Sequence, residues 1–206
     1  MARAPLRFDG WILGAAFASG DRFVVGTWPR SPLGSFADVM WARPDGTRVL
    51  LAPDETVAAF VRRHYTFDEH HLSAVHVEVS TRRLRVTAAP LTMDLELDPP
   101  SLLSWLLRLR PRWLRTLRPW IAVEDVVVRP LVAPLLGWSP GIRARGRTRD
   151  GTREWYAIHA YRRANARARL DGVDLGACVR APASGFGFSE FPAEAAAVRV
   201  TSLFEA

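Results

Sequence analysis

The sequence predicts a mainly β protein, a β-barrel or strongly curled antiparallel sheet of about ten strands. A central helical insert is expected around residues 101–118, and a short helix around residues 54–64. Two observations support this fold class. Short alternating apolar runs are separated by turns rich in Gly, Pro and Asp. Two such blocks flank one insert, which suits a single barrel better than two domains. We therefore expect residues 1–206 to form one β-rich domain, with 99–137 as a helical or irregular insert.

Composition restricts the class of protein further. The chain has 206 residues and is 49% hydrophobic, enough for a sizeable core. No apolar stretch approaches the roughly 20 residues that span a membrane, and no signal-peptide core follows the first nine residues. A single cysteine excludes an internal disulfide framework. Together these features predict a cytoplasmic protein.

The first block of strands is marked by its turns. Residues 23–28 read as a strand after the turn Ser19-Gly20-Asp21. Residues 36–42 and 47–51 flank Pro44-Asp45-Gly46, a strong hairpin signal. The alternation of apolar residues predicts three more strands, at 75–79, 84–88 and 91–97.

Two features predict the short helix at 54–64: a capping residue at its start and apolar residues at helical spacing. Asp54 can accept a hydrogen bond from the first turn of the helix. Val57, Phe60 and Val61 fall at helical spacing, so they share one apolar face.

The insert begins where Asp98-Pro99-Pro100 interrupts the strands. Ser101 is an expected N-cap for a helix at 102–109, which Pro111 ends, and a second short helix is expected at 112–117. Leucines and tryptophans form an apolar stripe beside several arginines. The stripe is interpreted as a plug that completes the core, as an interfacial helix on an anionic membrane, or as a lid over a pocket.

The second block resumes at residue 142. Strands at 142–148 and 153–161 flank a turn at Asp150-Gly151, and Asp171-Gly172 marks a third hairpin before a strand at 173–175. A Gly-interrupted strand at 186–188 and a closing strand at 197–204 complete the expected fold.

Charge is distributed unevenly along the chain. All 28 basic residues are Arg, so a Schiff base, a lysine general base and a standard P-loop are excluded. Residues 101–169 hold 15 of the arginines but only four of the 21 acids, which indicates a positive face or cleft for an anionic partner. Four of these arginines alternate at positions 143, 145, 147 and 149. On a strand they would share one face, either solvated or anion-binding.

Acids that interrupt apolar strands are the candidates for chemistry. Asp38 and Glu154 lie within predicted strands, and an inward-facing carboxyl must be hydrogen-bonded, paired or protonated. Such a group is either a general acid or base or half of a structural ion pair. His159 is a third candidate, but it serves the same pocket as Glu154 only if a β-bulge lies between them, because their parity on an ideal strand is opposite.

Other chemistry has little support in the sequence. Four histidines cluster at positions 64, 70, 71 and 76, but their spacing matches no established metal motif, so we expect no metal and a polar surface loop at 68–71. Ser189 lies outside a G-x-S-x-G elbow, and Cys178 has no neighbouring His. No cofactor is predicted.

Three segments carry a family resemblance: Trp28-Pro29-Arg30-Ser31-Pro32-Leu33-Gly34, then Ala37-Asp38-Val39-Met40, and Phe186-Gly187-Phe188. They resemble blocks of an actinobacterial β-rich protein family of about 200 residues, whose activity is not characterised, so no catalytic residue is transferred. Lipocalin-like barrels are similar in strand count only. Acetoacetate decarboxylase-like β folds are also similar, but their catalytic lysine has no counterpart here, which excludes that activity.

The function predicted from these features is binding of a small apolar or amphipathic, anionic molecule in a β-barrel pocket. Cofactor-independent acid/base chemistry of the isomerase, cyclase or hydratase type is a further expectation. Its candidate residues are Asp38, Glu154 and His159. The expected ligand-binding residues are Trp28, Trp41, Trp105, Tyr156, Phe188, Arg143 and Arg145. The alternative is a non-catalytic protein whose basic Arg/Trp surface binds an anionic membrane, nucleic acid or an acidic protein.

Overall fold

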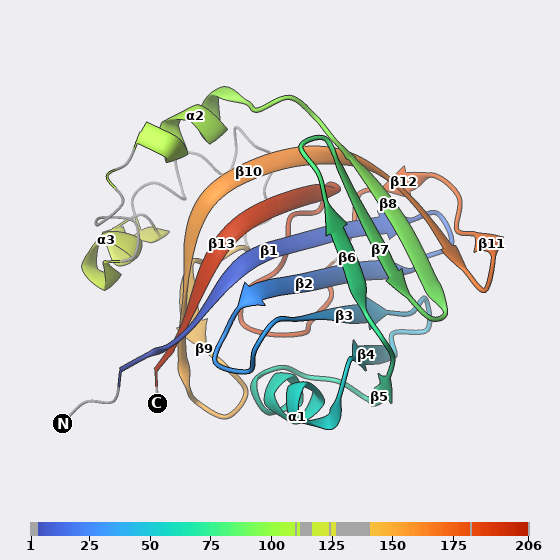
Figure 1. The fold of residues 1–206 in the computed structure, drawn as a ribbon, viewed down its shortest axis with the longest axis horizontal. Helices are drawn as coiled ribbons and strands as arrows, with labels where there is room; N and C mark the ends of the chain where they lie inside the picture. Colours follow the sequence, from blue (N-terminus) through green and yellow to red (C-terminus); the bar gives the residue numbers. More distant parts are fainter. Residues whose placement is uncertain are drawn as a thin grey trace.

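The computed structural model describes residues 4–109, 111, 117–123, 125–126, 141–181 and 183–205. One open, strongly curled sheet dominates it, with ten strands in the order β5-β4-β3-β2-β1-β13-β10-β8-β7-β6 (Figure 1). These strands are β1 (Leu6–Phe17), β2 (Arg22–Arg30), β3 (Phe36–Ala42), β4 (Arg48–Ala52), β5 (Glu69–Leu72), β6 (His76–Val79), β7 (Arg83–Ala88), β8 (Leu91–Leu97), β10 (Arg153–Leu170) and β13 (Ala196–Glu205). The predicted fold class, a curled and mainly antiparallel β structure, is confirmed.

Three short strands pair beside this path. β9 (Arg145–Arg147) and β11 (Val173–Asp174) pair with β10, and β12 (Cys178–Val179) pairs with β1. Among the described strands, all pairs are antiparallel except β4 with β5, which are parallel because α1 (Glu55–His64) connects them.

The curl depends on the long strand β10. Its first part pairs with β13 and its last part, residues 164–170, pairs with β8. The sheet therefore folds over, and β6, β7 and β8 cross in front of β1, β2 and β3 (Figure 1). The space between these two layers is filled by the largest apolar cluster, which includes Phe17, Phe23, Trp41, Leu84 and Met93. The inside of the curl is thus a packed core.

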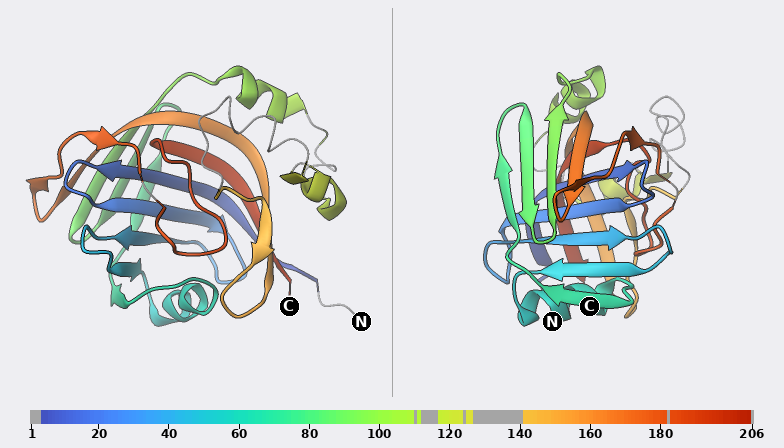
Figure 2. Two further views of the ribbon diagram at one scale, coloured as in Figure 1. Left: turned by 180° about the vertical axis from the view of Figure 1, so that it is seen from behind. Right: turned by 90° about the vertical axis from the view of Figure 1, so that its right-hand side faces the viewer.

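The opposite face of β1, β2, β3 and β13 is covered by other segments. α1 packs there through Val57 and Val61. The chain after β12 crosses the same face, as the view from behind shows (Figure 2, left). Phe191 from this segment lies so close to Gly14 of β1 that a Cβ there would be 2.3 Å from its ring. A second layer of packing therefore lies behind the sheet.

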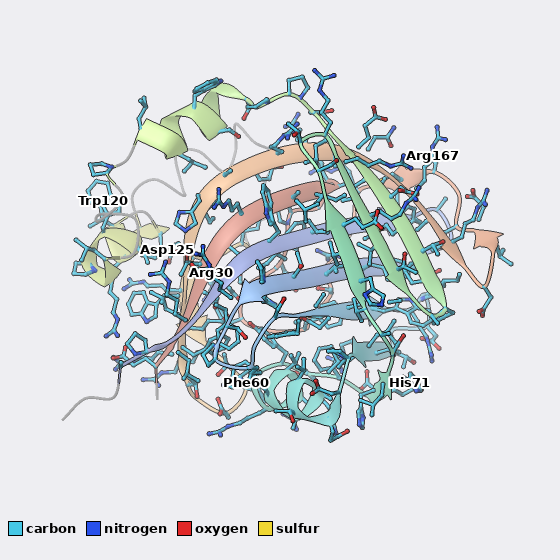
Figure 3. All side chains as sticks on the ribbon, in the orientation of Figure 1. Arg30, Phe60, His71, Trp120, Asp125 and Arg167 are labelled. Carbon is cyan, nitrogen blue, oxygen red and sulfur yellow. The ribbon has the colours of Figure 1, made fainter. Side chains whose placement is uncertain are left out.

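The short helix agrees with its prediction. α1 begins after Asp54, whose Oδ1 accepts a hydrogen bond from the backbone N–H of Val57 at 2.9 Å. The predicted apolar face is confirmed, since Val57 and Val61 are buried and Phe60 packs against Phe8 and Phe204 of the sheet, where Figure 3 labels it.

In the insert, α2 spans Leu102–Leu109 and α3 spans Arg118–Val123. α2 agrees with the predicted helix at 102–109 and packs against β10, where the Ser104 hydroxyl donates to the carbonyl oxygen of Tyr161. The second predicted helix, at 112–117, falls mostly outside the described residues. Among the described residues, no helix has the length and apolarity that crossing a membrane requires.

Most predicted strands are present, but some predictions differ. The strand expected at 186–188 is wrong, because the chain bends there while its Phe rings pack on Phe67 and Tyr156. A surface loop was expected at 68–71, but residues 69–72 form β5 because they pair with β4. β1 was not predicted, and it is the central strand between β2 and β13.

Candidate functional site

A cavity lies on the face of the sheet opposite the packed core. Its volume is about 140 Å³. An engineered apolar cavity of about 150 Å³ binds benzene, so the space suits a molecule with one ring. β1, β2, β3, β10 and β13 form its floor, and α1, residues 142–143 and residues 184–192 line its other sides. The lining is mainly aromatic and aliphatic and includes Phe8, Ile12, Val24, Trp28, Phe36, Met40, Phe60, Tyr65, Tyr156, Ile158, Tyr161, Phe186, Phe191, Val198, Val200 and Phe204.

Glu154 of β10 is a buried acid in this lining, with a side chain that is 1% exposed. The Tyr65 hydroxyl donates to its carboxylate at 2.7 and 2.8 Å, and the Ser202 hydroxyl donates at 2.7 Å. The Tyr156 hydroxyl lies 3.0 Å from that of Tyr65 and extends the chain of hydrogen bonds. Burial raises the pKa of Glu154 to about 7, although these hydroxyls favour its charged form.

Asp38 of β3 is the second buried acid, and it is 2% exposed. The indole N–H of Trp28 donates to Oδ1 at 3.3 Å. Gly26 leaves the room for this contact, because a Cβ there would be 2.6 Å from Oδ1. Burial raises the pKa of Asp38 to about 7, and the single indole hydrogen bond offsets this only in part.

The two acids face different parts of the cavity. β2, β1 and β13 lie between β3, which carries Asp38, and β10, which carries Glu154. At about 4.8 Å per strand, this is on the order of 19 Å along the sheet, shortened in space by its curl. The two carboxyls therefore line different parts of the cavity.

The segment that covers the cavity is held by a buried ion pair. Arg22 of β2 lies 3.3 Å from the carboxylate of Glu190, which also accepts hydrogen bonds from Ser184 and from the backbone N–H of Gly185. Arg22 donates to the carbonyl oxygen of Phe191 as well. Arg143 also lines the cavity but is exposed, so this residue lies at the rim.

Five of the residues predicted for the site line this one cavity. They are Asp38, Glu154, Trp28, Tyr156 and Arg143. Phe188 lies directly behind this lining, stacked on Tyr156 at 5.7 Å between ring centroids.

The other predicted site residues lie elsewhere. Trp41 does not wall the cavity, because its side chain packs in the core on the opposite face and donates to Asp21. Trp105 is 57% exposed on α2. Arg145 lies 3.7 Å from Asp125 and over the ring of Trp155, so it does not share a cavity face with Arg143.

His159 also lies outside the cavity lining. A β-bulge lies between Ile158 and Ala160, but His159 is itself the extra residue. Its Nε2 lies 2.8 Å from the hydroxyl of Thr201, which donates to Asp9 on the face opposite Ser202. His159 and Glu154 therefore do not serve one pocket.

Sequence reasoning missed Tyr65, Ser202 and the pair Arg22–Glu190. Ser202 had a readable signal, since it interrupts an apolar strand in the same way as Asp38. Tyr65 follows the end of α1, and its contact with Glu154 joins residues 89 positions apart, so no local pattern marks it.

The histidine cluster does not converge. His64 is buried and its Nδ1 lies 2.8 Å from the carbonyl oxygen of Phe60, whereas His70 and His71 are on β5 at the sheet edge, where Figure 3 labels His71. Within the described ranges, no group of three or more His, Cys, Asp or Glu side chains could hold a metal ion.

The fold and site define a class: a curled β half-barrel with an acid-containing apolar cavity behind its sheet. No family model and no curated protein matches the chain. A solved structure titled "Structural Studies of Acetoacetate Decarboxylase" is 11% identical, with a TM-score of 0.49, over 98% of this chain and 87% of that chain. The acetoacetate decarboxylase of Legionella pneumophila is also 11% identical, with a TM-score of 0.43, over 98% and 84%. No residue role follows from these similarities.

Proposed function

We propose that the protein binds a small, mostly apolar molecule of about one ring in this cavity, and that Glu154 transfers a proton to or from it. The observation that carries the proposal is a carboxyl that lines an apolar cavity and is hydrogen-bonded to Tyr65 and Ser202. The chemistry is cofactor-independent proton transfer of the isomerase, cyclase or hydratase type.

The hydroxyls around Glu154 support both of its protonation states. When Glu154 is charged, Tyr65 and Ser202 donate to it and Tyr156 donates to Tyr65. When Glu154 is protonated, its O–H donates and one hydroxyl reverses, because hydroxyls both donate and accept. The network can therefore hold a proton on Glu154, because a neighbouring hydroxyl can accept from it.

The pKa of Glu154 suits this role. A general acid or base works best when its pKa lies near the working pH. Burial raises the pKa of Glu154 to about 7, so both forms are populated near neutrality. Glu154 is buried, and burial away from bulk water strengthens electrostatic interactions between its carboxyl and a bound molecule.

An anionic group on the ligand would lie at the rim. Arg143 supplies a guanidinium there, whereas the interior holds the carboxyls of Asp38 and Glu154. We propose that an amphipathic ligand places its apolar body against the aromatic lining and any anionic end beside Arg143.

Hydrogen exchange of a ketone tests the catalytic part of the proposal. Cyclohexanone is incubated with the protein in D₂O, and loss of its α-hydrogens is followed by ¹H NMR. We expect the native protein to accelerate the exchange and Glu154→Gln to lose about a hundredfold or more of that acceleration. Glu78→Gln, at an exposed position on β6, is the control and should retain it. Equal rates with native protein and Glu154→Gln would contradict the assignment.

A second candidate function rests on α2. Trp105 is 57% exposed and Leu109 is 77% exposed, in the Arg-rich half of the sequence. We propose as the alternative that this surface binds an anionic membrane, nucleic acid or an acidic protein. Such binding weakens steeply as salt rises, whereas binding of an apolar molecule in the cavity does not, and this difference separates the two candidates.

A further inference from the structure

Asp38 has an unusual environment for a buried carboxyl. It is 2% exposed and lines the cavity, and its one hydrogen bond among the described residues comes from Trp28 at 3.3 Å. No cationic side chain of the described part of the chain pairs with it; burial and the Trp28 indole are what act on its charge. A carboxylate has about four sites that accept hydrogen bonds, so most of its capacity is unused.

A second Trp–Asp pair, between β3 and the residue that precedes β2, shows the contrast. Asp21, at the edge of β2, is also buried, and Trp41 of β3 donates to it at 2.7 Å. Asp21 accepts a further hydrogen bond from the Ser19 hydroxyl at 2.7 Å, and it lies outside the cavity lining. The protein therefore satisfies the buried Asp that faces away from the cavity more fully than the one that faces into it.

The surroundings of Asp38 are aromatic. Trp28 donates to the carboxyl, and Phe36 lies opposite Trp28 in the register of β2 and β3. Phe8 packs edge-on against both rings, at 5.9 and 6.3 Å between centroids. The faces of aromatic rings attract cations, and the attraction grows when the site excludes water.

We propose that the Asp38 end of the cavity binds a protonated primary amine carried by a ligand of about one ring. The amine donates one or two hydrogen bonds to the carboxylate and lies against the ring of Trp28. This inference rests on the proposed function, because it assigns a chemical class to the ligand of the same cavity.

The charges of the cavity favour an amine over other groups. Glu190 is paired with Arg22, and Arg143 lies at the rim, so the interior has acid groups without matching cations among the described residues. A carboxylate ligand would place like charges together at Asp38. A neutral alcohol would satisfy one acceptor site but leave the charge without a partner. An ammonium group supplies both the hydrogen-bond donors and the positive charge that the Asp38 carboxylate lacks.

Three matched one-ring probes test the inference: benzylamine, benzyl alcohol and benzoate. Their dissociation constants are measured by isothermal titration calorimetry near neutral pH for the native protein, Asp38→Asn and Asp21→Asn. We expect the native protein to bind benzylamine about tenfold more tightly than benzyl alcohol, the order that separates a charge-assisted from a neutral hydrogen bond. Asp38→Asn should remove this preference, and Asp21→Asn, which changes the buried acid outside the cavity, should preserve it.

The outcomes distinguish failure of the amine assignment from failure of the proposed binding function. Binding of benzyl alcohol with no gain for benzylamine overturns the amine assignment and leaves the cavity as a binding site. A preference for benzylamine that Asp38→Asn retains also overturns the assignment, because another group must then hold the amine. Failure of all three probes to bind the native protein overturns the proposed binding function itself.

Discussion

At the scale of single residues, the cavity is defined by two acids that the fold keeps away from water. Asp38 and Glu154 are both buried, but Glu154 accepts hydrogen bonds from two hydroxyls and Asp38 from one indole. Burial raises the pKa of each to about 7. Both carboxyls therefore bind a proton more tightly in the folded protein than in the unfolded chain.

This difference predicts how stability depends on pH. The unfolded chain releases these protons near pH 3.8 and 4.5, whereas the folded protein retains them until about pH 7. The folded state thus holds more protons between these values, so each acid lowers the stability as pH rises through that window. The loss is on the order of 3 to 4 kcal/mol per group and is complete above about pH 7.

Replacing either buried carboxyl by an amide removes the titration of that group. We expect Asp38→Asn and Glu154→Gln to gain stability relative to the native protein as pH rises from about 5 to 8. Urea unfolding at the two pH values measures the free energy of unfolding of each variant. A difference between variant and native protein that is the same at both pH values would show that the carboxyl is not protonated in the folded state.

At the scale of elements, the segment across the cavity depends on Glu190. Its carboxylate joins Ser184 and Gly185 to Arg22, which is buried on β2. Removing one partner of a buried ion pair leaves a buried charge without its counter-ion, which costs several kcal/mol.

Glu190→Ala should therefore loosen this segment. We expect about 3 kcal/mol of lost stability and faster hydrogen exchange of the Ser184 and Gly185 backbone N–H groups, measured by NMR. Glu194→Ala is a matched control on the same segment, since Glu194 pairs with the exposed Arg163 and Arg180, and should cost about 1 kcal/mol or less. Equal effects of the two variants would refute a special role for Glu190.

Elements with a local signal were predictable from sequence. Asp54 predicted the start of α1, and the turn at Asp45-Gly46 predicted the hairpin of β3 and β4. Elements set by distant pairing were not. The bulge at His159 reverses which side of β10 faces the cavity, so Glu154 and Tyr161 both line it despite opposite parity. Sequence alternation alone does not locate such a bulge.

The candidate site was predictable in part for the same reason. An acid within an apolar strand signals a special environment, which identified Asp38 and Glu154. Which side of the sheet holds the cavity depends on how the sheet folds over. Trp28 and Trp41 lie on neighbouring strands, and the sequence does not distinguish them. Trp28 faces the cavity, whereas Trp41 faces the packed core.

At the scale of the whole molecule, the surplus of arginine is partly used in internal contacts. Arg162 donates to the backbone carbonyl oxygens of Thr81 and Asp98, and Arg118 lies 2.6 Å from Glu205. Arg63 pairs with Asp150 at 2.6 Å. These contacts link separate segments of the chain, so a count of arginines overstates the charge that is available to an anionic partner.

The central claim is that the space behind the sheet, and not the inside of its curl, receives a small molecule. NMR mapping of backbone amide shifts during a titration with benzyl alcohol tests it most directly. The account predicts shifts that cluster at cavity positions such as Gly26, Val200 and Ser202, with none at Leu84 and Leu95 in the packed core. Shifts confined to α2, or centred on Leu84 and Leu95, would contradict it.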